Sequence, residues 1–171
     1  HAQSLEVALK AAAQTKEQAI KWILLGSGPE KEKLLAMKKE MGLDNVFFFE
    51  PLPKAVMPGV WKSVDVSLVP LRPIELFKGA IPSKIFESAA MKKPLLLGVE
   101  GEAKQLFIDE GKAGVAFIPG NAADLAAKAM YLYNNRDKCA EMGENVRSYV
   151  NATFNRDTIA ESFYRHLTNL S

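Results

Sequence analysis

The sequence predicts an α/β fold in three layers, a parallel sheet with helices on both of its faces. Short apolar runs alternate along the chain with amphipathic stretches of helical length, which is the order of βαβ units. These runs consist mainly of apolar residues, as strands buried on both faces require. Strands are therefore expected at residues 20–25, 46–49, 64–69, 94–99 and 115–118.

The expected helices follow from apolar side chains at helical spacing. In the first, Ser4 to Lys16, the side chains of Leu5, Leu9 and Ala12 fall on one stripe. Gly42 is the expected end of the second helix. The remaining helices are expected at residues 29–41, around 56–61, and at 82–91, 103–109, 122–134, 136–153 and 157–170. Residues 71–81 are expected to be irregular.

Ligands of open parallel sheets bind beyond the carboxyl ends of the strands. The predicted order places four segments around one such cleft: Gly26-Ser-Gly28, Pro51-Leu-Pro53, Leu71 to Lys84 and Gly98 to Gly101. The first of these has two interpretations. It is either a turn that needs glycine or a close approach to a nucleotide, and the third glycine of a dinucleotide fingerprint is absent.

The most informative segment is Ala80 to Gly98, predicted as loop, helix and buried strand. Pro82 is expected at the first helical position, where its missing N–H costs no hydrogen bond. Ile81 has no side-chain oxygen to cap the helix, so the amides of Ser83 and Lys84 would be left for an anion. Glu87, one turn further on, suits ribose hydroxyls, although Lys84 and Glu87 can also be a surface ion pair.

Composition excludes several classes of function. A chain of 171 residues is expected to form one domain, and a net charge of +2 is too small to indicate nucleic-acid binding. A single cysteine, Cys139, fits a reducing compartment, so a cytoplasmic protein is expected, with a peripheral position at the inner membrane face as an open alternative. No apolar run reaches membrane-spanning length. One Cys and two distant His leave no metal site, and none is predicted.

Several sequence segments, taken in order, resemble one known domain. They are Ile23-Leu-Leu-Gly-Ser-Gly28, Asn45-Val-Phe-Phe-Phe-Glu-Pro51, Trp61-Lys-Ser-Val-Asp-Val-Ser-Leu-Val-Pro70, Ile81-Pro-Ser-Lys-Ile-Phe-Glu87, Met91-Lys-Lys-Pro94, Glu102 before an amphipathic helix, and Gly111-Lys-Ala-Gly114. The chain resembles the carboxyl-terminal, Rossmann-like donor-binding domain of GT-B glycosyltransferases of the retaining family four. The segment from Ile81 to Glu87 looks most similar to bacterial N-acetylfucosamine-type transferases of surface polysaccharide assembly.

For the nucleotide, the resemblance implies contacts from two loops. Gly26 and Ser27 would approach the nucleotide by their backbone, and the loop of Glu50, Pro51 and Leu52 would hold the base. The implied donor is a nucleotide-diphosphate sugar, most readily a UDP-sugar, and the resemblance implies neither a cofactor nor a metal.

For the reacting part of the donor, the resemblance implies contacts from the helix start and the next loop. Pro82, Ser83 and Lys84 would meet the diphosphate, and Glu87 would bind the ribose. Gly101 and Glu102 would lie near the sugar. Lys84 and Glu87 are accordingly the candidate catalytic residues.

The chain departs from the family in two respects. The family often has two glutamates separated by seven residues, but only Glu87 matches, because Gly79 stands at the first position; Glu75 is displaced by four residues. The family's first strand, with the Arg and Lys that neutralise the diphosphate, and its acceptor domain would both precede residue 1. The chain is therefore expected to be an inactive part of a two-domain enzyme, with Lys84 its only evident cation at the site and open sheet edges that favour homo-oligomers.

Two alternatives to a glycosyltransferase remain open at this point. A sugar-nucleotide epimerase of GT-B architecture would need acid and base residues across the cleft, and none stands out. A non-catalytic nucleotide-binding module would bind a nucleoside diphosphate without transferring a sugar. Neither the sugar nor the acceptor follows from these residues.

Overall fold

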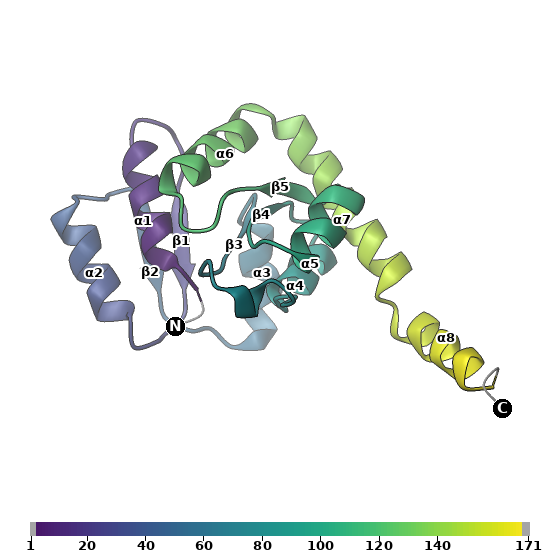
Figure 1. Cartoon of the computed structure of the whole chain (residues 1–171). Helices are drawn as coiled ribbons and strands as arrows, with labels where there is room; N and C mark the ends of the chain where they lie inside the picture. The colour runs from purple at the N-terminus through teal and green to yellow at the C-terminus, as the bar shows by residue number, and fades with distance from the viewer. Residues whose placement is uncertain (1–2, 169–171) are drawn as a thin grey trace.

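The computed structural model describes residues 3–168, an α/β arrangement of parallel strands flanked by helices (Figure 1). Strand β1 (Trp22–Leu25) pairs with β2 (Val46–Phe49), and β4 (Leu95–Gly98) lies between β3 (Ser67–Pro70) and β5 (Gly114–Ala116). Each of these pairings is parallel. The predicted fold class is confirmed, but the strands form two sheets in place of a single one.

The helices follow the predicted order with shifted ends. Their bounds are α1 Leu5–Gln14, α2 Lys31–Glu40, α3 Met57–Lys62, α4 Lys84–Ala90, α5 Glu102–Lys104, α6 Ala122–Asn134, α7 Arg136–Thr153 and α8 Arg156–Thr168. Short 3₁₀ helices occupy Lys54–Val56 and Glu75–Phe77, the second within the segment expected to be irregular. The helix expected at 103–109 is mostly a π-helix, Gln105–Glu110. Leu170, the expected end of the last helix, lies outside the described residues.

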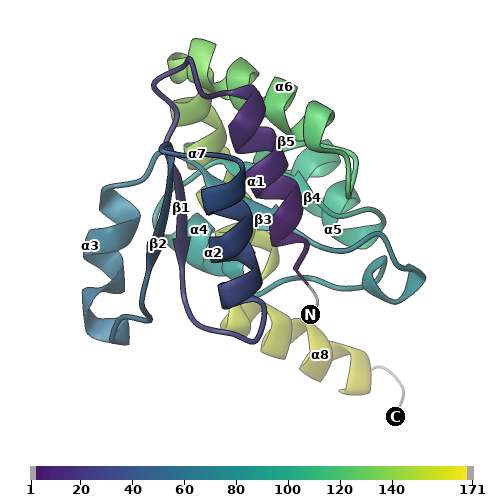
Figure 2. The ribbon, with the colours of Figure 1, turned by 90° about the vertical axis from the view of Figure 1, so that its left-hand side faces the viewer.

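Backbone hydrogen bonds show which edge of β1 is paired. The N–H groups of Trp22 and Gly26 donate to the carbonyls of Asn45, just before β2, and of Phe49, its last residue, at 2.8 and 3.0 Å, so those of Ile23 and Leu25 point away from β2. Strand β1 lies between β2 and β3 in both views of the ribbon (Figures 1 and 2). It forms no pairs with β3 in the described chain. The edge of β1 opposite β2 is therefore open.

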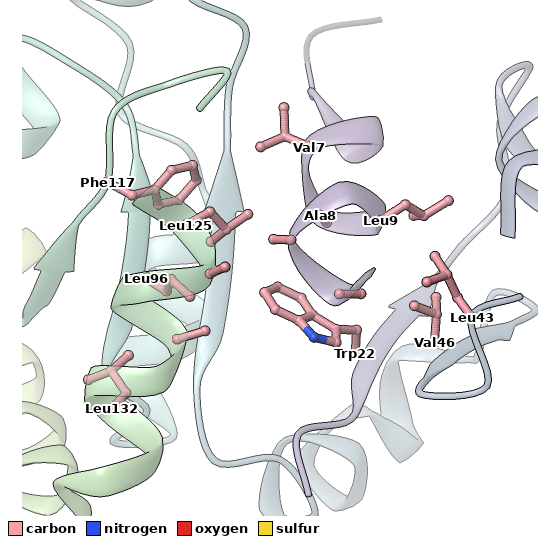
Figure 3. Close-up of a cluster of buried hydrophobic side chains, with 14 of the residues drawn as sticks. Val7, Ala8, Leu9, Trp22, Leu43, Val46, Leu96, Phe117, Leu125 and Leu132 are labelled. Atoms are coloured by element: carbon pink, nitrogen blue, oxygen red, sulfur yellow. The ribbon is translucent and has the colours of Figure 1, made fainter. Parts of the chain in front are cut away.

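One apolar cluster nevertheless joins the two sheets. Helix α1 packs against α6, and the side chains beneath them come from both sheets (Figure 3). Trp22 and Val46 belong to the first sheet, and Leu96 to the second. A second buried cluster lies on the α4 and α7 side and contains Ile85, Leu97, Phe107 and Val146. The side chains, rather than a continuous hydrogen-bond ladder, hold the layers together.

Helix α8 stands apart from both clusters. It has no buried residue, and it extends away from the rest of the molecule (Figure 1). Ile159 and Phe163, one turn apart, are exposed. None of the described helices is long and apolar enough to cross a membrane.

Candidate functional site

The structure places the predicted site segments at one edge, because each follows the carboxyl end of a strand. Gly26 and Ser27 follow β1, and Glu50 follows β2. Gly26 has a φ of 144°, a backbone conformation that favours glycine, and its N–H donates to the carbonyl of Phe49 at 3.0 Å. This bond holds the turn after β1 against the end of β2, beside the loop that contains Pro51 and Leu52.

Helix α4 begins later than predicted. Its first residue is Lys84, and Ser83 is the N-cap residue, so Pro82 lies before the helix. The backbone hydrogen bonds explain the later start. The first N–H groups to bond are those of Ile85, which donates to the Pro82 carbonyl, and of Phe86, which donates to the Ser83 carbonyl, both at 3.0 Å. The N–H groups of Ser83 and Lys84 donate to no described residue. The two amides are thus available to an outside acceptor, as expected.

Lys84 is a half-buried cation without an ion-pair partner among the described residues. Burial lowers the pKa of Lys84, and the nearby charge of Glu87 acts in the opposite direction. Glu87 is exposed on the next turn. The surface ion pair considered from the sequence is not formed, and neither side chain has an ion-pair partner among residues 3–168.

Gly101 is fixed by close packing against the loop before α4. It has a φ of 77°, and a side chain there would place its Cβ 2.3 Å from the carbonyl oxygen of Lys78. The same oxygen accepts the N–H of Glu102 at 2.8 Å. Only glycine allows this contact, which holds the loop after β4 against residues 75–78.

A small pocket of about 60 Å³ lies between these two loops. Its charged lining residues are Arg72, Glu75, Lys78 and Glu100. Glu75 is exposed and pairs with Lys78 at 2.8 Å, so it is a solvated loop charge that also borders the pocket. The pocket is not lined by Ser83, Lys84, Glu87, Gly26 or Leu52.

The predicted residues therefore share an edge but not one enclosed site. Gly26, Ser27, Glu50, Pro51 and Leu52 belong to the first sheet, and the others belong to the second. Glu50 forms an ion pair with Lys31 at the start of α2. The cleft predicted from the sequence is open between its two halves.

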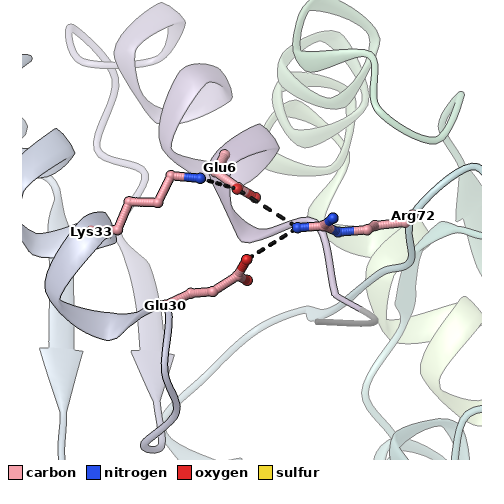
Figure 4. Close-up of polar contacts among 4 residues, drawn as sticks. All are labelled: Glu6, Glu30, Lys33 and Arg72. Carbon is pink, nitrogen blue, oxygen red and sulfur yellow. Dashed lines mark hydrogen bonds and ion pairs between the residues drawn. The ribbon is translucent and has the colours of Figure 1, made fainter.

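A cluster of four charged residues bridges these halves at the carboxyl edge (Figure 4). The Arg72 Nη2 lies 3.1 Å from Oε1 of Glu30 and 4.0 Å from Oε1 of Glu6. Lys33 Nζ donates to Glu6 at 2.9 Å. This hydrogen bond is the main reason why the pKa of Glu6 is lowered.

The cluster corrects the expectation that Lys84 is the only evident cation at the site. Arg72 follows β3 directly at the same edge, and Lys78 lies a few residues further. No local sequence signal marks Arg72, because its partners Glu6 and Glu30 are far away in sequence and meet it through the crossovers. Among residues 3–168 there is no group of His, Cys, Asp and Glu able to hold a metal ion.

The sequence matches the model of one protein family, described as glycosyl transferases group 1, over residues 1–149. This chain belongs to that glycosyltransferase family. A search of curated proteins gave no significant match. The family assignment agrees with the parallel α/β fold.

Solved structures similar to this glycosyltransferase domain share its fold. A glycosyltransferase from Rickettsia africae has a TM-score of 0.81 at 18% identity, over 100% of this chain and 46% of that one. HepE from Anabaena, solved with UDP-glucose, has a TM-score of 0.79 at 20% identity, over 98% and 45%. The catalytic domain of cholesterol-α-glucosyltransferase from Helicobacter pylori has a TM-score of 0.68 at 21% identity, over 90% and 92%.

The chain spans about a third to a half of the first solved chains that it matches, 33% of TarM from Staphylococcus aureus and 45% of HepE. At these levels of identity the similarity shows the fold. The substrate and the acceptor belong to the proposal below.

Proposed function

We propose that this chain is the donor-binding domain of a retaining glycosyltransferase that moves a sugar from a nucleotide-diphosphate sugar, a UDP-sugar foremost, to a glycan or lipid-linked acceptor in surface polysaccharide biosynthesis. The N-acetylfucosamine-type resemblance of residues 81–87 is part of this proposal. The acceptor would bind a second domain, and sugar transfer requires both domains. The protein would act in the cytoplasm, at the inner face of the membrane.

The observation that carries the proposal is the start of α4. Two backbone amides without described partners, at Ser83 and Lys84, adjoin a half-buried lysine without an ion-pair partner. A leaving diphosphate gains negative charge, and fixed amides and cations stabilise that charge. Glu87, exposed one turn on, is positioned for ribose hydroxyls. Lys84 and Glu87 are therefore the proposed functional side chains.

The other predicted residues take backbone or loop roles in this proposal. Gly26 and Ser27 approach the nucleotide, and Glu50, Pro51 and Leu52 hold its base. Pro82 aligns the chain before α4, and the loop of Gly101 and Glu102 lies near the sugar. No metal and no cofactor takes part in the proposed reaction.

The test is a titration of the chain with UDP, GDP and dTDP, followed by NMR or calorimetry. We expect binding of at least one nucleotide, and the Glu87→Ala variant should lose roughly 1.5–3 kcal/mol through two charge-assisted ribose hydrogen bonds. Glu141→Ala, at an exposed position on α7, is the matched control and should leave the affinity unchanged. If none of the three nucleotides binds, or if Glu87→Ala binds as tightly as the parent chain, the assignment is wrong.

A further inference from the structure

We propose that Arg72 binds the diphosphate of the donor and that Glu30 holds the Arg72 guanidinium when no donor is bound. This assignment rests on the proposed function, because it adds a phosphate-binding residue to the same site. It predicts that an entering diphosphate displaces a carboxylate already present at the edge of the sheet.

The position of Arg72 is the first step of the argument. It lies just beyond the carboxyl end of β3, at the edge where α4 also begins. Arg72 is also one of the residues that line the small pocket, together with Lys78 and with Glu100 of the loop after β4. Its side chain keeps 40% of its surface exposed, so an outside ligand can reach it.

The hydrogen bonds of Arg72 are the second step. Within the described part of the chain, only Nη2 donates to a carboxylate, to Glu30 at 3.1 Å, and Glu6 stays 4.0 Å away (Figure 4). The Nε and Nη1 donors bond to no described residue. A guanidinium presents paired N–H groups that fit two phosphate oxygens at once, so these donors match a diphosphate.

The pairing of Glu6 is the third step. Glu6 receives its hydrogen bond from Lys33 at 2.9 Å, so it keeps a partner when Arg72 turns away. The Arg72–Glu30 pair is half-buried and rests on one N–H bond to one carboxylate oxygen, whereas a diphosphate can accept two or more short, charge-assisted bonds from a guanidinium. The exchange of Glu30 for phosphate oxygens is therefore favourable and does not dismantle the cluster.

The experiment compares UDP with uridine, which lacks the phosphates, by NMR titration of the chain and of four variants. Arg72→Gln should weaken UDP binding about tenfold and leave uridine binding unchanged. Arg72→Lys keeps the charge but loses the paired N–H groups, so its affinity for UDP should lie between those of the parent chain and of Arg72→Gln. Glu30→Gln removes the competing carboxylate and should tighten UDP binding by about two- to fivefold. This gain should vanish in the double variant with Arg72→Gln.

The outcomes separate this inference from the proposed function. Failure of the parent chain to bind UDP, GDP and dTDP overturns both. Binding of UDP by the parent chain and by Arg72→Gln with equal affinity overturns only the role of Arg72. A loss of UDP and uridine affinity together in Arg72→Gln also overturns it, because that pattern reports a structural role. Circular dichroism of each variant checks that it is folded.

Discussion

The indole Nε1 of Trp22 donates a hydrogen bond of 3.1 Å to the buried hydroxyl of Thr15. This bond joins the residue that follows α1 to the first residue of β1. The Thr15 hydroxyl lies 3.3 Å from each of the carbonyl oxygens of Ala11 and Ala12, on the last turn of α1. One hydroxyl thus anchors the end of the helix and the ring that lies under it.

Replacing Trp22 with Phe should destabilise the chain by about 1–3 kcal/mol, because the buried ring shrinks and the bond to Thr15 is lost. Urea unfolding would measure the change in the free energy of unfolding. The Thr15→Val variant removes the same bond from the other side. The double variant should be destabilised by about 0.5–1.5 kcal/mol less than the sum of the two single variants, because both single changes remove the same hydrogen bond. Strict additivity would show that the bond contributes nothing.

Gly143 allows α7 to pass close to the chain that follows α4. A Cβ at this position would lie 2.2 Å from the carbonyl oxygen of Lys92. This oxygen belongs to the backbone of a residue with a φ of 52°, so it cannot move aside as a flexible side chain would. Gly143→Ala should therefore cost about 1–3 kcal/mol of stability. Gly79→Ala is the matched control, because no atom lies within 4 Å of its added Cβ. A Gly143→Ala chain with the midpoint of the parent in urea would contradict the close contact.

The pKa of Glu6 is lowered below 4.5, mainly by the hydrogen bond from Lys33. A carboxyl group with a lowered folded pKa stabilises the fold above its unfolded pKa, and this contribution is lost as pH falls through the folded value. Carboxyl groups titrate between about pH 6 and pH 3. The free energy of unfolding of the parent chain, measured across this interval, should show the loss. In Glu6→Gln the dependence should be flatter, while Glu32→Gln, at an exposed position, should behave as the parent. If stability depends on pH in Glu6→Gln as it does in the parent chain, Glu6 does not contribute to the loss of stability at low pH.

The open edge of β1 predicts a pattern of amide exchange. The N–H groups of Trp22 and Gly26 are bonded to the carbonyls of Asn45 and Phe49, whereas those of Ile23 and Leu25 point to the open side. Hydrogen–deuterium exchange followed by NMR should therefore be slow at the first pair and faster at the second. Equal protection of all four would indicate that another strand occupies the edge.

Unpaired edges also invite contact with a second chain. We predict that light scattering will show dimers or larger assemblies as the protein concentration rises. A monomer that persists at high concentration, with fast exchange at Ile23 and Leu25, would show that the edge stays open without self-association.

The sequence predicted the elements better than their assembly. The apolar runs that became β2 and β4 are local patterns, and the spacing of Leu5 and Leu9 is a property of one helix. Whether β1 pairs with β3 depends on backbones that are remote in sequence, so the division into two sheets had no local signal. The same is true of Arg72, whose partners come from other elements. The π-helix after Lys104 differs from an α-helix in the hydrogen bonds of one turn, which residue spacing does not encode.

Helix α8 has a consequence for how the molecule unfolds. A helix of 13 residues with no buried side chain is marginal in water when it must form unaided. It therefore contributes little to the heat absorbed in the main transition, and heating should remove its ellipticity first. A protease that cuts after Phe154 would release it and leave a core whose midpoint temperature is unchanged. The chain thus unfolds on heating as two units. One is the packed domain before α8, which unfolds cooperatively, and the other is α8, whose helicity depends on solvent and temperature alone.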